Sequence, residues 1–153
     1  MSNVRFLVAR MRSVVISLTL ALWAGAAPAA EAPFSGDWYI DLRTPQERMQ
    51  NRECGGAYFK LSQIGDKITG DHGSATSGCG RLNEGGAETV KGVVVGTTAV
   101  LVVTSGRNGA MVLGRATKRG SSLQWTTLEE LKPGEPEADS PLILGEGLLT
   151  LRK

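Results

Sequence analysis

A single histidine, His72, stands among the residue types that catalytic triads use. It lies in the run Asp71-His72-Gly73-Ser74, with Ser77 close behind. A triad needs an acid that holds the base and a base that touches the nucleophile, and neighbours on one loop do not usually reach that geometry. We therefore predict a histidine on a surface loop and no catalytic residue. A hydrolase that uses loop residues such as His72 is the alternative.

The N-terminal segment has the pattern of a secretory signal peptide. Arginines precede an apolar run without a charge at residues 14–27, and Ala27-Pro28-Ala29 forms an A-x-A cleavage site. The run is too short to span a bilayer comfortably, and an uncleaved anchor is the alternative. We predict a signal peptide at residues 1–29, a single domain at residues 30–153, and a periplasmic or secreted protein without a stable membrane span.

Removing the signal peptide changes the charge of the chain. Lys plus Arg falls from 17 to 14, while Asp plus Glu stays at 15. The basic balance of the whole chain therefore belongs to the signal peptide. Because no basic run with interleaved aromatic residues remains, nucleic acid is not an expected partner.

Cys54 and Cys79 are the two cysteines of the chain. An even pair in an exported protein predicts one disulfide, which would stabilise the fold by roughly 3–4 kcal/mol in the chain-entropy model. One histidine and two cysteines cannot build a closed zinc site. We expect no metal and no cofactor.

Short runs of β-forming residues fill the rest of the chain, and Gly, Asn, Ser and Thr separate them. This pattern is typical of antiparallel strands joined by tight turns, and Asn108-Gly109 is the strongest hairpin signal. The polar segments 43–53 and 132–141 are expected to be loops, the first with one helical turn at most. Strands are expected at residues 35–42, 57–64, 67–71, 90–95, 99–105, 111–117, 121–128 and 147–152, with a short ninth strand at most at residues 79–83.

Sequential strands with short connections predict an all-β fold. We expect an antiparallel up-and-down meander that closes as an eight-stranded barrel, because closure removes the two exposed edges of an open sheet. Connection by hairpins favours the barrel, and a two-sheet β-sandwich is the alternative.

The predicted barrel interior is apolar, and no titratable group is expected to project inward. An eight-stranded barrel is just wide enough to be filled by its own side chains or to hold one small ligand. Gly70, Gly92 and Gly114 fall on the inner face, where they either mark bulges and strong coiling or leave a cavity. If there is a cavity, the candidate ligand-binding residues are Trp38, Phe59 and Trp125.

An apolar set on the outer side of three neighbouring strands is a candidate interface. A monomer seldom leaves such a patch bare, which favours a homo-oligomer or a protein partner. The alternative is cover by residues 129–146, whose large apolar side chains are Leu131, Leu142, Ile143 and Leu144. The candidate interface, which we call the valine face, consists of Val93, Val95, Val100, Val102, Met111 and Leu113.

Two groups of polar residues, separate in the sequence, are expected to lie at the same end of the barrel. Arg107 and Asn108 lie at a hairpin tip, and Arg81 and Asn83 lie near the predicted disulfide, with Tyr58 close by. Such side chains are candidates to fix a ligand or a partner. Turn chemistry and solvation explain them equally well.

The run Ser35-Gly36-Asp37-Trp38 and Arg152 near the chain end resemble the calycin-type barrels. These include lipocalins, avidins and a bacterial periplasmic family of small metalloprotease inhibitors. In such barrels a Gly-x-Trp motif opens the first strand, and an arginine near the chain end often packs on that tryptophan. The resemblance therefore implies that Arg152 packs on Trp38.

Other features separate the members of this group. The two tryptophans that follow the signal peptide do not match the several tryptophans of an avidin-type biotin site. Lipocalins carry a helix where this chain has the acidic, proline-rich segment 132–141. The size, the Ser-Gly-x-Trp opening and the single predicted disulfide resemble the inhibitor family, in which residues 31–34 would precede the barrel.

Together these features predict an exported, non-enzymatic binding protein. The leading hypothesis is a small protein-inhibitor or protein-partner module with a filled core. The alternative is a carrier of a small apolar ligand, and the volume inside the barrel separates the two. A purely structural role in the cell envelope is also open, since no feature of the sequence opposes it.

Overall fold

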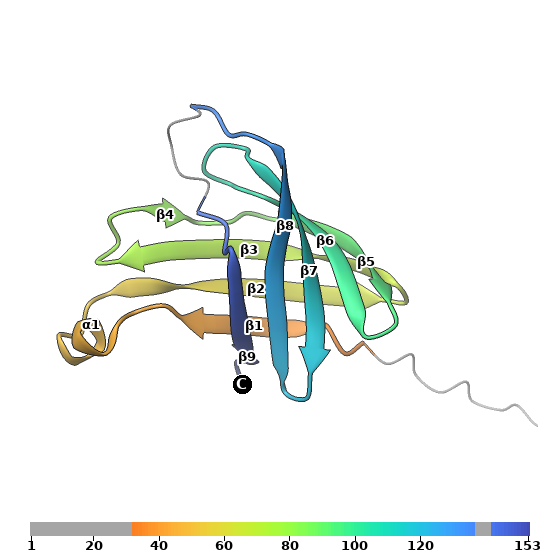
Figure 1. The fold of residues 1–153 in the computed structure, drawn as a ribbon, viewed down its shortest axis with the longest axis horizontal. Coiled ribbons are helices and arrows are strands. Elements are labelled where there is room, and N and C mark those ends of the chain that lie inside the picture. The colour runs from red at the N-terminus through yellow and green to blue at the C-terminus, as the bar shows by residue number, and fades with distance from the viewer. Residues whose placement is uncertain (1–31, 137–141) are drawn as a thin grey trace, which may run out of the picture.

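The computed structural model describes residues 32–136 and 142–153, which form a β-barrel (Figure 1). The predicted signal peptide and residues 137–141 lie outside the described residues. The elements are β1 (Gly36–Asp41), α1 (Pro45–Met49), β2 (Cys54–Ile64), β3 (Lys67–Ser77), β4 (Leu82–Asn83), β5 (Val90–Val95), β6 (Thr98–Thr104), β7 (Met111–Arg119), β8 (Ser122–Lys132) and β9 (Glu146–Leu151).

The strands form one antiparallel sheet in the order β2-β1-β9-β8-β7-β6-β5-β3-β4. A further pairing between β2 and β3 closes the sheet into an eight-stranded barrel, and β4 lies outside the closure on the edge of β3. The prediction of an antiparallel up-and-down barrel is confirmed, and the sandwich is not formed.

The register of β6 and β7 follows the predicted sharing of faces. Ala99, Leu101 and Val103 pair with Ala116, Gly114 and Val112, and all of these residues are buried. The connecting loop, residues 105–110, is longer than the predicted turn of two or four residues, but it also has an even length. An even loop keeps the same side chains on the inner face.

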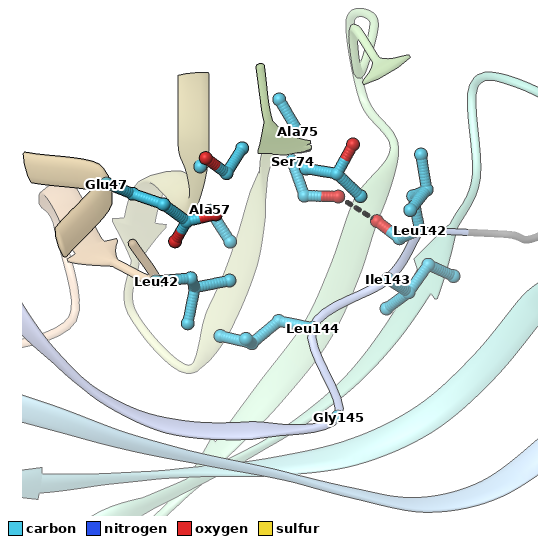
Figure 2. A pocket seen from close by; sticks show the side chains of 12 residues that line it. Leu42, Glu47, Ala57, Ser74, Ala75, Leu142, Ile143, Leu144 and Gly145 are labelled. Atoms are coloured by element: carbon cyan, nitrogen blue, oxygen red, sulfur yellow. Dashed lines mark hydrogen bonds between the residues drawn. The ribbon is translucent and has the colours of Figure 1, made fainter. Parts of the chain in front are cut away.

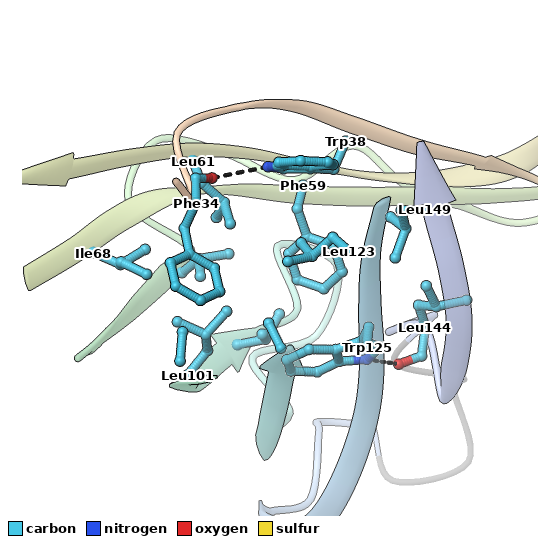
Figure 3. Close-up of a cluster of buried hydrophobic side chains, with 14 of the residues drawn as sticks. Phe34, Trp38, Phe59, Leu61, Ile68, Leu101, Leu123, Trp125, Leu144 and Leu149 are labelled. Carbon is cyan, nitrogen blue, oxygen red and sulfur yellow. Dashed lines mark hydrogen bonds between the residues drawn. The ribbon is translucent and has the colours of Figure 1, made fainter. Parts of the chain in front are cut away.

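Side chains of the chain itself fill the barrel (Figure 3). The ring of Trp125 lies against Gly114, where an added Cβ would overlap it. The inward glycine at this position therefore makes room for a tryptophan and leaves no cavity there. The buried cluster consists of Phe34, Trp38, Ala57, Phe59, Leu61, Ile68, Val90, Ala99, Leu101, Val103, Val112, Ala116, Leu123, Trp125, Leu144 and Leu149.

Several strands are longer than the sequence predicted, and β2 begins at Cys54. β3 continues to Ser77, so the prediction of a loop after Asp71 was wrong, and β8 continues to Lys132. The small residues of β3 are typical of loops, but they serve packing here: the Tyr58 ring of β2 covers Gly73. The predicted strand at residues 79–83 shrinks to β4.

The short helix α1 follows β1. Thr44 caps it, with its side chain accepting from the Glu47 N–H (3.2 Å) while the Glu47 carboxylate accepts from the Thr44 N–H (2.7 Å). This is the single helical turn that the sequence allowed. Among the described residues, no helix has the length and apolar character needed to cross a membrane.

The predicted disulfide is present. Cys54 at the start of β2 is bonded to Cys79, which follows β3, and their Cα atoms are 5.3 Å apart. The bond links the open end of the β2–β3 hairpin, at the end of the barrel where α1 lies (Figure 1).

Candidate functional site

One end of the barrel is crossed by a short segment that precedes β9. The segment consists of Leu142, Ile143, Leu144 and Gly145, and we call it the strap and this end of the barrel the mouth. The strap reaches from β3 and β4 to β8, although β3 and β8 are not neighbours in the sheet. It therefore spans the opening rather than extending an edge.

Leu144 is the anchor of the strap. Its carbonyl oxygen accepts a hydrogen bond from Trp125 Nε1 (2.6 Å; Figure 3) and another from Thr127 Oγ1 (3.0 Å), and both residues are on β8. Its backbone N–H donates to His72 Nε2 on β3 (3.3 Å). The Leu144 side chain is 7% exposed and packs in the core cluster. Both polar backbone groups and the side chain of this residue are thus held by the barrel.

Leu142 is held from the other side of the mouth. Its carbonyl oxygen accepts from the Ser74 hydroxyl of β3 (Figure 2) and from Asn83 Nδ2 of β4 (3.4 Å). Asn83 is buried, and its Oδ1 accepts from the N–H groups of Gly85 (3.3 Å) and Gly106 (3.1 Å). Asn83 therefore connects the strap to the loop between β6 and β7.

His72 is the buried titratable group of the mouth, and the prediction of a surface loop histidine was wrong. It is 0% exposed, because β3 continues through it and alternation places it on the same inner face as Ile68. The Phe59 ring meets it edge-on at 4.6 Å between centroids. The prediction that no titratable group projects inward fails at this residue.

Burial lowers the pKa of His72 to about 4, because desolvation disfavours the charged ring. The ring is therefore neutral at ordinary pH. Since Nε2 accepts a hydrogen bond, the proton of the neutral ring lies on Nδ1. Nδ1 is buried and has no hydrogen-bond partner among the described residues.

The Asp-His-Ser sequence around His72 does not assemble a triad in the described structure. Alternation along β3 places Asp71 on the opposite face from His72, where its Oδ1 accepts from the Glu88 N–H (3.0 Å). Ser74 lies on the same face as His72, but its hydroxyl donates to the Leu142 carbonyl oxygen. The acid, the base and the nucleophile thus have separate structural partners.

A groove of about 370 Å³ lies beside the strap, between α1 and the paired ends of β2 and β3 (Figure 2). Leucine and alanine side chains provide its apolar surface, and hydroxyl groups provide polar contacts. The residues that line it are Leu42, Glu47, Gly55, Ala57, Ser74, Ala75, Thr76, Ser77, Leu142, Ile143, Leu144 and Gly145.

Glu47 brings a negative charge to this groove. Hydrogen bonds, first from the Thr44 backbone N–H and then from the Ser77 hydroxyl, hold the pKa of its carboxyl below the usual value. The carboxylate is therefore ionised at neutral pH. A partner with a donor or a cation next to an apolar group complements such a groove.

The opposite end of the barrel is closed. Phe34 is fully buried, its carbonyl oxygen accepts from Trp38 Nε1 (2.8 Å), and its N–H donates to Gln63 Oε1 (3.2 Å). The Lys118 ammonium lies 4.4 Å from the centroid of the Trp38 ring. The chain is tied down before β1 begins.

Arg152 does not pack on Trp38, so the contact implied by the calycin resemblance is not formed. Its guanidinium lies 3.5 Å from the centroid of the Tyr39 ring, and its N–H donates to the Asp37 carbonyl oxygen (2.8 Å). Trp38 points into the barrel, whereas Tyr39 lies on the opposite face of β1. Arg152 thus stacks on the outer face, and Lys118 takes the position over the tryptophan.

The three predicted ligand-binding residues meet inside the barrel. Phe59 and Trp125 are 4.9 Å apart between ring centroids, and Trp38 belongs to the same cluster. None of the three is more than 1% exposed, and none lines the groove at the mouth. They fill the interior.

The valine face lies on the outer side of β5, β6 and β7, as predicted. Val93 is 46% and Val95 is 67% exposed, and the other four residues are half-buried. Residues 142–144 lie at the mouth, and Leu131 is itself 48% exposed. The described part of segment 129–146 therefore leaves Val93 and Val95 open.

The predicted polar residues of the barrel end do converge in part. Arg107 donates to the Leu82 carbonyl oxygen next to Asn83 (3.3 Å), and Tyr58 donates to the Glu84 carbonyl oxygen (3.1 Å). Arg81 is exposed, and the Asn108 carbonyl oxygen accepts from the Glu135 N–H (2.9 Å). Most of these contacts join loops, and Asn83 also holds the strap.

The residues that hold Leu144 were missed by sequence reasoning, although one signal was present. Extending the alternation of Ile68 and Gly70 by one step would have placed His72 inside.

In the ranges 32–136 and 142–153, no group of three or more His, Cys, Asp or Glu side chains is placed to hold a metal ion. A scan against protein-family models, a search of curated proteins and a search of solved structures each found no match.

Proposed function

We propose that this chain is an exported, non-enzymatic binding protein that engages a protein partner at the mouth of a calycin-like barrel. The observation that carries the proposal is the groove of about 370 Å³ beside the strap, at the end of a barrel whose interior is filled. The signal-peptide pattern and the disulfide support export, because disulfides persist in oxidising compartments.

The filled core argues against the carrier. Trp38, Phe59 and Trp125 are buried by their neighbours, and the Trp125 ring occupies the space above Gly114. A ligand inside the barrel would have to displace these rings and create unpacked volume, which costs several kcal/mol in a close-packed core. Binding at the mouth requires no such change.

The groove suits a protein segment. It combines apolar surface from Leu42 and Leu144 with hydroxyl groups and the Glu47 carboxylate. Its volume fits one or two side chains, and its open side leaves room for the rest of a partner. The segment before the barrel is a poor candidate for the contact, because Phe34 is buried and both of its backbone polar groups are hydrogen-bonded.

Site-specific cross-linking tests the proposal. A photoreactive phenylalanine analogue replaces Leu42, which is 49% exposed in the groove, and the control position is Leu148, which is 50% exposed on β9. The chain is expressed in its source cells with its own signal. We expect a covalent protein adduct at position 42 and none at position 148.

The partner identified by mass spectrometry then provides a quantitative test. Thr76→Trp fills the groove from an exposed position and should weaken binding of the purified partner about tenfold or more. It also removes the exposed hydrogen bond from the Arg81 N–H to the Thr76 hydroxyl (3.0 Å), so the variant should remain folded with a slightly lower melting temperature. Adducts that form equally at both positions, or not at all, contradict binding at the mouth. A co-purified small molecule seen by native mass spectrometry would support the carrier instead.

A further inference from the structure

The barrel holds its own strap as a receptor holds a bound peptide. Five side chains from three strands converge on the backbone of only two strap residues, Leu142 and Leu144. These side chains are far from the strap in sequence and belong to β3, β4 and β8. They are His72, Ser74, Asn83, Trp125 and Thr127.

These contacts are side chain to backbone, which distinguishes them from strand pairing. The ladder between β8 and β9 extends from Ser122 to Thr126 on β8, and the Thr127 N–H donates to the Gly145 carbonyl oxygen (2.7 Å). Beyond that bond, the strap leaves the sheet and enters the mouth. Sheet formation alone therefore does not explain why four side-chain donors and one side-chain acceptor contact the backbone of the strap.

The buried polar side chains of the site need an occupant that satisfies their hydrogen bonds. His72 and Asn83 are buried, and the ring of Trp125 is buried as well. Removing the strap would leave His72 Nε2 and Trp125 Nε1 without their described partners, which is costly for groups shielded from water. The site is thus built to hold a peptide with a carbonyl, an N–H and a side chain at the place of Leu144.

We propose that the strap is an internal ligand of a peptide-binding site, and that a partner segment with leucine at the place of Leu144 occupies this site when the strap leaves. The inference rests on the proposed function in taking that segment from a protein partner. It also names the chemistry of the partner: an apolar peptide segment with an uncharged leucine-like anchor.

The groove lies where an incoming partner segment can bind before the strap leaves its site. The strap itself forms one wall of the groove, so a partner bound there already touches the strap. Leu142 and Ile143 are half-buried and Gly145 is exposed, which leaves Leu144 as the buried anchor. Replacing one buried leucine and its hydrogen bonds by another is a balanced exchange.

Supplying the strap in trans tests the inference. Leu144→Gly in the chain without its signal peptide removes the anchor, and the probe is a capped synthetic peptide with the sequence of residues 142–147. Trp125 contacts Leu144, so its fluorescence reports occupancy, and calorimetry gives the Kd. We expect the variant to bind the peptide about tenfold or more tightly than the wild type, in which the covalently attached strap competes for the same site.

Matched controls establish which contact matters. Leu148→Gly also removes a leucine, but from β9 outside the groove, and it leaves the strap in place, so it should bind the peptide no better than the wild type does. A probe peptide with aspartate at the place of Leu144 should bind Leu144→Gly about ten- to a hundred-fold more weakly, because a buried leucine contributes that much. Equal affinity for the two peptides would overturn the inference.

A second variant covers the case in which Leu144→Gly does not fold. Leu144→Ala shortens the anchor of the strap and leaves every barrel residue of the site unchanged, so the strap should exchange with added peptide. A folded variant of either kind that binds no peptide overturns the inference. Peptide binding without a cross-linked partner at position 42 would leave the internal ligand standing and remove the proposed partner.

Discussion

His72 Nε2 accepts a hydrogen bond from the backbone N–H of Leu144 at 3.3 Å, across 72 residues of sequence. The bond joins the middle of β3 to the strap inside a closed mouth. It exists only while the ring is neutral, because a protonated Nε2 would be a donor facing another donor. This makes the strap sensitive to the protonation of one residue.

We predict that the protein loses stability as pH falls from about 6.5 to about 4. The pKa of His72 is about 4 in the folded chain, against 6.5 for an unperturbed histidine. Between these values the unfolded chain binds the extra proton, so stability rises with pH in this window and falls as pH drops. The shift corresponds to about 3 kcal/mol, all of it present above pH 6.5 and lost below pH 4.

Urea unfolding at several pH values measures this dependence, and His72→Gln is the matched variant. Glutamine retains an acceptor but does not titrate, so the variant should lack the slope between pH 4 and 6.5. Asp41 has a pKa lowered to about 2, mainly by its hydrogen bond from Arg43, and its effect falls below the window. Equal slopes in the wild type and the variant would contradict the assignment to His72.

Gly114 is the second position where a small change should have a large effect. A Cβ at this position overlaps the Trp125 ring, which is buried and bonded to the strap. We expect Gly114→Ala to lower the free energy of unfolding by about 1–3 kcal/mol, the usual cost of overpacking. The control is Gly145→Ala, where no atom lies within 4 Å of the added Cβ. A similar effect in both variants would remove the steric explanation.

The alternation of β5 to β7 was predictable because it is local. In β6, Ala99, Leu101 and Val103 are buried, while the residues between them are half-buried, and the even loop keeps this order in β7. The period of two and the hairpin signal were enough to place these side chains. The same reasoning located the valine face.

The site was not predictable for a physical reason. Residues 72–77 are small or polar and have little alternation of their own; the pairing with β2 and the packing of Tyr58 on Gly73 make them a strand. The strap is defined by contacts between Leu144 and residues up to 72 positions away. No local pattern encodes such contacts, and the sequence suggested for the leucines of the strap only the alternative that they cover the outer face.

The disulfide should contribute measurably to stability. We expect Cys54→Ser, or reductant added to the native protein, to lower the melting temperature, with a loss of about 2–4 kcal/mol in the free energy of unfolding. Thermal unfolding with and without reductant provides the measurement. The Cys54→Ser variant is its own control, since reductant should not change it further. A melting temperature that neither treatment alters would show that the bond does not stabilise the fold.

The valine face predicts association of two copies at high protein concentration. Lys91, Val102, Leu113 and Glu129 lie side by side across β5, β6, β7 and β8, with a positive charge at one end of the row and a negative charge at the other. A second copy turned about the strand direction would set Lys91 against Glu129 and the apolar residues against each other. Lys91 also pairs with Glu88 at 3.3 Å, in an exposed and therefore weak contact.

Light scattering over a range of concentrations tests this arrangement. Lys91→Glu and Glu129→Lys should each raise the Kd of the dimer, by about tenfold or less as expected for exposed charges, and the double variant should restore it. An equal mixture of the two single variants should also form mixed dimers, because opposite charges then meet at both contacts. Val95→Lys should prevent association, whereas Leu148→Lys, on β9, should not. If the protein is a monomer at every concentration, the prediction that two copies associate through the valine face is wrong.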